Sequence, residues 1–193
     1  MPENPSSSAP LEAPLPDHIQ LTHEGADLVL DVRWFRPYHL FMLVFTVFWC
    51  GFLAFWYGMA LRSPSAPSMM LWFPLIHVAV GIGMAYGTLA GFLNHTRITV
   101  GSGVVAVRIG PVPWRGQTRL EAREITQVFC EEVRTNTRSG ANFSYRVNVI
   151  TPGNQKLRLV SGLAGSDLAL FIEQEIEKAL GITDRKVPGE LQK

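Results

Sequence analysis

Residues 37–62 read PYHLFMLVFTVFWCGFLAFWYGMALR, and residues 63–96 continue as SPSAPSMMLWFPLIHVAVGIGMAYGTLAGFLNHT. Apart from Arg62 at their boundary, these stretches hold no Asp, Glu, Lys or Arg, which leaves uncharged runs of 25 and 34 residues. A bilayer hydrocarbon core about 30 Å thick is crossed by roughly 20 apolar helical residues. The sequence therefore predicts a transmembrane hairpin within residues 37–94, with helices over about residues 40–61 and 69–93.

Two other interpretations of the apolar runs agree less well with the sequence. A core helix of a soluble protein usually brings in polar residues before about 18 positions have passed. A cleaved signal peptide opens with a positively charged region, whereas the first apolar run here begins near residue 40, after a proline-rich stretch. We therefore expect both helices to be retained as membrane spans.

Arginines near the ends of the two predicted helices indicate their orientation. Arg33 and Arg36 precede the first helix, Arg97 and Arg108 follow the second, and the connecting residues 63–68 carry no charge. Lys and Arg close to the span ends cross a membrane least readily. We expect a membrane protein with both termini in the cytoplasm and the connection outside.

The rest of the chain predicts a β-rich domain. Residues 1–16 hold five prolines and three consecutive serines, the composition of a disordered tail. Apolar residues at every second position predict a β-hairpin over residues 17–36 and a soluble domain over residues 95–182, followed by a tail over residues 183–193. Five strands are expected in the soluble domain, over residues 96–100, 104–109, 125–134, 143–151 and 156–160.

The last predicted element is an amphipathic helix over Ser166–Leu180. Its apolar residues recur at spacings of three and four, Ser166 is the expected N-cap, and Gly181 fits the helix end. The longest polar connection between strands is expected over residues 135–141, where a partner would dock. Two strands before the membrane and five after it give seven strands and one capping helix.

Three segments carry a resemblance to known proteins: FLNHTR at residues 92–97, residues 105–116 with GPVPW at 110–114, and LFIEQEIE at 170–177 before LGI at 180–182. In these, over roughly residues 18–190, the chain resembles bacterial membrane proteins that join a transmembrane hairpin to a pleckstrin-homology-like domain. In layout it resembles, more distantly, the photosystem I assembly protein family. The resemblance implies an α+β protein of the bacterial cytoplasmic (inner) membrane, whose antiparallel β-barrel is capped by the C-terminal helix. The hairpin over residues 17–36 either completes that barrel or packs alone.

Small and aromatic residues of the two spans are candidates for helix contacts. Glycines recur every four residues on one face of the second span and let another helix approach closely, at Gly83, Gly87 and Gly91. That helix is either the first span or a helix of another protein. Aromatic side chains crowd the first span, and we expect four of them to face a partner: Phe48, Phe52, Phe55 and Trp56.

His77 is the one ionisable side chain well inside the second span. An intramembrane histidine can ligate the metal of a haem or pigment, or it can hydrogen-bond between helices. Because no second histidine follows at ligand spacing, the sequence predicts no cofactor and no metal.

Two further groups of residues are expected near the membrane surface. Trp34, Trp114 and Arg115 are candidates for the membrane interface, although Trp114 could equally pack on the barrel. A basic surface is expected to attract anionic lipid, or else to be a solvated sheet face with interleaved glutamates. Its members are Arg119, Arg123, Arg134, Arg138, Arg146, Lys156 and Arg158. No nucleic-acid binding is expected, since that requires a stronger basic stripe with accessible aromatic residues.

The sequence contains no glycine-rich phosphate loop, no metal-spaced His or Cys cluster and no nucleophile elbow. We therefore expect no enzyme. The leading hypothesis is a non-catalytic integral membrane accessory, scaffold or assembly subunit of a larger complex, whose partners are other integral membrane proteins. The alternative is a stand-alone membrane-anchored module that binds anionic lipid.

Overall fold

The computed structural model describes residues 18–63, 67–137, 140–183, 185 and 187–191. The tail expected over residues 1–16, the middle of the connection over residues 63–68, and Arg138 lie outside the described residues. The described chain divides into two compact units. Residues 23–122 form the first unit, and the described residues before 23 and after 122 form the second.

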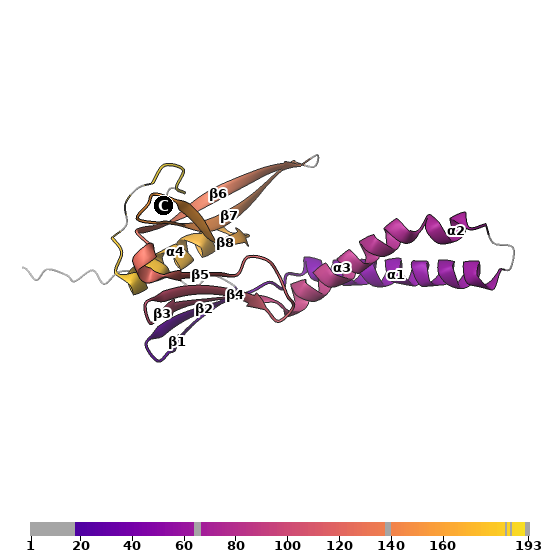
Figure 1. Ribbon diagram of the computed structural model, residues 1–193, viewed down its shortest axis with the longest axis horizontal. Coiled ribbons are helices and arrows are strands. Elements are labelled where there is room, and N and C mark those ends of the chain that lie inside the picture. Colours follow the sequence, from indigo (N-terminus) through magenta and orange to yellow (C-terminus); the bar gives the residue numbers. More distant parts are fainter. Residues whose placement is uncertain (1–17, 64–66, 138–139, 184, 186, 192–193) are drawn as a thin grey trace, which may run out of the picture. The chain divides into compact units, whose positions relative to one another are not determined.

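Two long apolar helical segments form a hairpin in the first unit (Figure 1). The first is α1 (Tyr38–Arg62), and the second is divided into α2 (Met69–Trp72) and α3 (Leu75–Leu93). The division falls at Pro74, which has no N–H to continue the helical hydrogen bonds. Both segments are long and apolar enough to cross a membrane. In each, only 11% of an apolar stretch of 18 residues is buried. A core helix of a soluble protein would be mostly buried.

A five-stranded antiparallel sheet lies mainly in the same unit, and only the first four residues of its strand β1 belong to the second unit. Its strands are β1 (Ile19–Glu24), β2 (Asp27–Arg33), β3 (His95–Gly101), β4 (Val104–Gly110) and β5 (Thr118–Glu121), hydrogen-bonded in that order. The turns are tight: Gly25 has φ +67°, and Ser102 and Gly103 both have positive φ between β3 and β4. Two consecutive residues with positive φ suit a two-residue hairpin connection.

The helical hairpin is inserted between two strands that are neighbours in this sheet. β2 pairs antiparallel with β3, with Leu30 opposite Ile98 and Arg33 opposite His95. The pairing continues one residue further, because the Trp34 N–H donates to the Asn94 carbonyl at 3.2 Å. Both ends of the hairpin are therefore held together by the sheet. This pairing also answers whether the β-strands before the first helix join the strands after the second.

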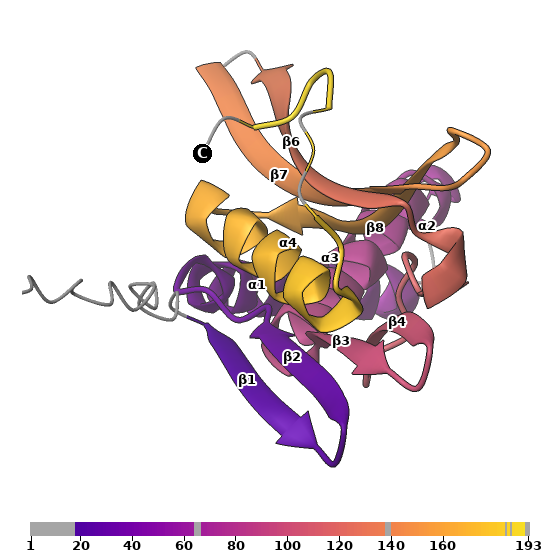
Figure 2. The same cartoon turned by 90° about the vertical axis from the view of Figure 1, so that its left-hand side faces the viewer.

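The second unit contains a three-stranded antiparallel sheet of β6 (Gln127–Thr137), β7 (Gly140–Ile150) and β8 (Lys156–Leu163). α4 (Ser166–Leu180) packs on all three strands (Figure 2). Its apolar stripe is fully buried at Ile172 and Ile176. α4 ends at Gly181, whose left-handed conformation lets the Ile182 N–H bond to the Glu177 carbonyl.

The strands differ from the expected barrel in two respects. They form two separate sheets rather than one closed barrel, since β5 and β6 are not hydrogen-bonded neighbours and a 3₁₀ turn, η1 (Ala122–Glu124), stands between them. There are also eight strands among the described residues rather than seven. β5 was missed because it has only four residues, which do not alternate clearly between apolar and polar.

Two local expectations were also wrong. The polar connection over residues 135–141 is mostly strand, since β6 runs to Thr137 and β7 begins at Gly140. Nearly all residues of this stretch are polar, and neither face of the two paired strands is buried here. The sequence therefore lacks the apolar–polar alternation by which a strand is recognised. The N-cap of α4 is Gly165, with no side-chain cap, and the Ser166 hydroxyl donates to Asp167 instead.

Candidate functional site

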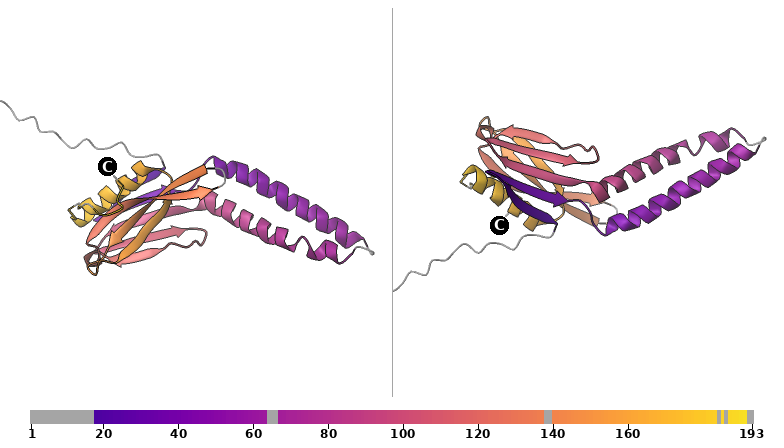
Figure 3. Two further views of the ribbon diagram at one scale, coloured as in Figure 1. Left: turned by 90° about the horizontal axis from the view of Figure 1, so that it is seen from above. Right: turned by 90° about the horizontal axis from the view of Figure 1, so that it is seen from below.

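The two arms of the helical hairpin are joined by hydrogen bonds from aromatic side chains of α1. The Trp49 indole N–H donates to the His77 carbonyl at 3.1 Å, and the Trp56 indole N–H donates to the Met70 carbonyl at 3.0 Å. The Tyr57 hydroxyl donates to the carbonyl of Leu71 at 3.0 Å. α1 and α3 accordingly run side by side in both views of Figure 3.

The three candidate glycines do not share one environment. A Cβ on Gly91 would lie 2.1 Å from Cδ2 of His39 on α1, whereas a Cβ on Gly83 or Gly87 would meet nothing within 4 Å. The close approach inside the hairpin is made instead by Gly81, against Trp49, and by Gly91. Sequence reasoning missed Gly81, because this residue does not belong to the every-four-residues series of Gly83, Gly87 and Gly91.

The candidate partner-facing aromatic residues also separate into two kinds. Phe48, Phe52 and Phe55 are 71%, 52% and 69% exposed, and their spacing of four and three residues aligns them on one face of α1. We call these three residues the phenylalanine ridge. Trp56 differs from them, since its hydrogen bond to Met70 ties it to the other arm of the hairpin.

His77 lies between two aromatic rings, with centroids 5.8 Å from Trp49 and 5.6 Å from Phe73. Its Nδ1 is buried and makes no hydrogen bond within the described part of the chain. The described residues also contain no group of three His, Cys, Asp or Glu side chains that could hold a metal ion. The two aromatic neighbours therefore account for the position of the ring.

The candidate interface residues meet where the hairpin joins the sheet. Trp34 and Trp114 are in edge-to-face contact at 5.3 Å, and Tyr86 of α3 stacks on Trp114 at 5.9 Å. The Tyr86 hydroxyl donates to the Pro113 carbonyl, and the Trp34 indole N–H donates to the Thr96 hydroxyl. Trp114 thus packs on neighbours and remains 41% exposed, beside the exposed Arg115.

Asn94 fixes the loop that carries Trp114. Its side-chain amide donates to the Val112 carbonyl at 2.9 Å, and its oxygen accepts the Val112 N–H at 2.7 Å. Asn94 is only 3% exposed, so these bonds are shielded from water. Sequence reasoning had no signal for this role, because the partners are 18 residues apart.

The candidate basic residues are divided between the two units. Arg119 lies on β5 of the first unit, and the other described candidates lie in the second unit. Arg134 lies over the Phe143 ring at 5.9 Å, and Arg123 belongs to the 3₁₀ turn η1. Among the described candidates, the pairing of β6, β7 and β8 places three on one sheet face: Arg146, Lys156 and Arg158.

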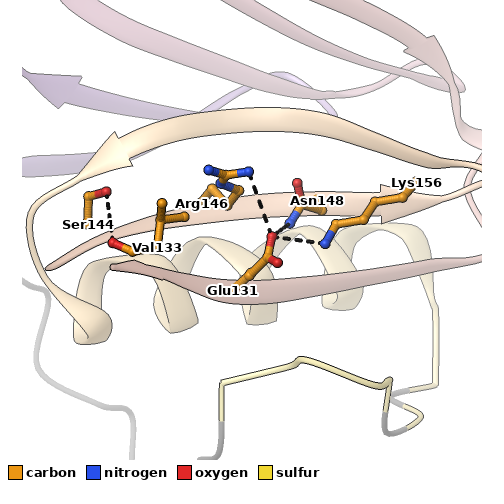
Figure 4. Close-up of polar contacts among 6 residues, drawn as sticks. All are labelled: Glu131, Val133, Ser144, Arg146, Asn148 and Lys156. Atoms are coloured by element: carbon orange, nitrogen blue, oxygen red, sulfur yellow. Dashed lines mark hydrogen bonds and ion pairs between the residues drawn. The ribbon is translucent and has the colours of Figure 1, made fainter. Parts of the chain in front are cut away.

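Glu131 is the acidic side chain that Arg146 and Lys156 approach, as Figure 4 shows. Its Oε2 accepts from Lys156 Nζ at 2.9 Å and from Asn148 Nδ2 at 3.1 Å, and Arg146 Nη1 lies 3.9 Å away. The Lys156 hydrogen bond lowers the pKa of the Glu131 carboxyl below its ordinary value of 4.5. Asn148 and Arg146 act in the same direction, against the opposing effect of partial burial. Glu131 is therefore charged at neutral pH.

Three surfaces of the described residues are candidates for contact with other molecules. They are the phenylalanine ridge, the aromatic group of Trp34, Tyr86 and Trp114, and the Glu131 side of the three-stranded sheet. Compared with known proteins, the chain matches no protein-family model and no curated protein.

Proposed function

We propose that this chain is a non-catalytic integral membrane accessory, scaffold or assembly subunit of a larger membrane complex. The helical hairpin anchors it in the bacterial cytoplasmic membrane, with both termini in the cytoplasm. The phenylalanine ridge of α1 packs on helices of a partner membrane protein. This role agrees with the resemblance to bacterial membrane proteins that carry a pleckstrin-homology-like domain.

The observation that carries the proposal is that the aromatic residues of α1 fall into two groups, one bonded within the hairpin and one exposed. Trp49, Trp56 and Tyr57 donate hydrogen bonds to the other arm, whereas the side chains of the phenylalanine ridge are exposed. Lipid chains are as apolar as these side chains, so helix association in a bilayer depends on close packing. A row of large, rigid rings supplies a shape that a partner helix can match.

The experiment compares the triple substitution Phe48→Leu/Phe52→Leu/Phe55→Leu with wild type. Trp56 is left unchanged because its indole bonds within the hairpin. A matched control places leucine at exposed positions of the other arm, with Ile76→Leu and Ile82→Leu. Each tagged chain is purified in mild detergent, and co-purifying membrane proteins are quantified by mass spectrometry.

We expect the triple substitution to lower recovery of stoichiometric partners, since leucine is apolar but has another shape. The control should retain the partners, and all chains should remain in the carbonate-washed membrane fraction. If the triple variant recovers partners as wild type does, the proposed interface is refuted. The stand-alone lipid-binding module would then be the better account.

Orientation is tested with single cysteines in a chain whose Cys50 and Cys130 have been replaced by serine. Ser63→Cys, at the outer end of α1, should react with a membrane-impermeant thiol reagent in intact cells. Ser161→Cys, on β8, should react only after the cells are opened. Labelling of Ser161→Cys in intact cells would contradict the proposed topology.

A further inference from the structure

One face of the three-stranded sheet carries a polar cluster, which we call the Glu131 cluster: Glu131, Arg146, Asn148 and Lys156. In the strand register Glu131 lies opposite Arg146, and Asn148 lies opposite both Phe129 and Arg158. Cross-strand partners point to the same face of a sheet, so these side chains share one surface. Figure 4 shows Arg146, Asn148 and Lys156 directed toward the Glu131 carboxylate.

Lys156 reaches this carboxylate across the middle strand. It starts on β8, while Glu131 belongs to β6 on the other side of β7. Its Nζ lies 2.9 Å from Glu131 Oε2 and 4.9 Å from the Phe129 ring centroid. Asn148 and Phe129 beneath it are each 2% exposed. The cluster therefore has a buried floor and a rim of charged groups.

The bases on this face exceed the acids. Along the paired parts of β6, β7 and β8, the register places Arg146, Lys156 and Arg158 on this face with Glu131 as their single acidic neighbour. Arg146 Nη1 lies 3.9 Å from Glu131, too far for a hydrogen bond. Arg146 Nε is buried and has no hydrogen-bond partner among the described residues. One donor of the Arg146 guanidinium is thus without a partner among the described residues.

We propose that the Glu131 cluster is a binding site for a phosphate-class oxyanion, with Glu131 as an internal counter-ion that limits its affinity. Arg146 and Lys156 donate to the anion, Arg158 adds positive charge beside them, and Asn148 supplies a neutral donor. An arginine fork matches phosphate geometry, and lysine binds it as a point charge. The anion is either a lipid headgroup phosphate or a free phosphate.

Because Glu131 is a counter-ion inside the site, substitutions of Glu131 and of Lys156 should change phosphate affinity in opposite directions. Glu131→Gln removes a negative charge beside the incoming anion and frees Lys156, while glutamine can still accept from Asn148. Phosphate affinity should then rise about tenfold, as expected for removing one close like charge near a partly exposed surface. Lys156→Gln should lower it about tenfold through loss of one charged donor. Lys178→Gln, an exposed lysine on α4, is the matched control and should leave affinity unchanged.

The measurement uses the full ¹⁵N-labelled chain in phosphatidylcholine nanodiscs. The Arg146 Nε–Hε resonance, assigned by its loss in Arg146→Lys, is followed while inorganic phosphate replaces chloride at constant ionic strength. A second arm replaces part of the phosphatidylcholine with phosphatidylglycerol. A shift in phosphatidylglycerol discs without added phosphate identifies the lipid headgroup, and a shift with inorganic phosphate alone identifies a free phosphate.

Either shift supports the site, provided that it saturates and follows the stated order of variants. The site is refuted if neither anion moves the Arg146 resonance, or if Lys156→Gln and Lys178→Gln behave alike. It is also refuted if a folded Glu131→Gln variant binds no more tightly than wild type. If Glu131→Gln does not fold, the phosphate affinities of Lys156→Gln and Lys178→Gln decide whether the site exists. None of these outcomes depends on the phenylalanine ridge.

Discussion

Gly91 lies where α3 comes closest to α1, and replacing it with alanine tests how the hairpin is packed. The new Cβ would lie 2.1 Å from Cδ2 and 2.3 Å from Nε2 of His39, whereas ordinary contact begins near 3.4 Å. The imidazole or the helix must therefore move by roughly 1 Å or more. The ring is not free to move, because the Arg36 backbone N–H donates to its Nδ1 at 3.0 Å and Phe92 packs against it.

The expected cost has two parts. Overpacking a fitted contact costs about 1–3 kcal/mol, and losing the Arg36 hydrogen bond adds about 0.5–1.5 kcal/mol. Gly91→Ala should therefore lower the free energy of unfolding by roughly 2–4 kcal/mol, less a few tenths that alanine returns through helix propensity. Gly83→Ala is the control, because its Cβ meets nothing within 4 Å.

The assay is reversible unfolding in mixed micelles for Gly91→Ala, Gly83→Ala, His39→Ala and the double variant His39→Ala/Gly91→Ala. Removing the imidazole removes the clash, so the double variant should be more stable than the sum of the two single effects predicts. Equal stability of Gly91→Ala and Gly83→Ala would refute the reasoning. The reasoning would also be refuted if the stability losses of His39→Ala and Gly91→Ala simply added up in the double variant.

Two further predictions concern polar groups. Asn94→Ala should destabilise the chain by roughly 2–3 kcal/mol, because it leaves the buried N–H and carbonyl of Val112 without their partners. Unfolding in micelles should show the lower stability, and amide hydrogen exchange at Val112 should become faster. Unchanged exchange at Val112 would contradict the prediction. Folding lowers the pKa of Glu131 below its ordinary value of 4.5, so its carboxylate contributes stability that is present above that pH and lost as pH falls through the folded pKa. The stability difference between wild type and Glu131→Gln should therefore be constant near neutrality and shrink below about pH 4.5, and a difference that grows on acidification would contradict the assignment.

Local sequence patterns predicted most of the elements. An uncharged run longer than 20 residues satisfies its backbone polar groups internally only as a helix in an apolar medium, so both long helical segments were predicted within a few residues. Spacings of three and four predicted α4, and the freedom of glycine at positive φ predicted its end at Gly181. Alternation predicted the longer strands, where one face is buried. It could not identify β5 or the ribbon at the tip of β6 and β7, where alternation is weak.

The sequence by itself therefore determined most of the segments that become helix or strand, because each of these depends on neighbours within a few residues. The tertiary structure alone decided which elements meet. Pairing of β2 with β3 joins strands separated by the whole helical hairpin, and no local pattern records that partnership. The packing face of α1 was equally hidden: the helix is apolar on every side, so composition cannot select the face that meets Gly81 and Gly91. The Glu131 cluster likewise forms only when three strands are aligned in register, which brings charges from distant positions within hydrogen-bonding distance.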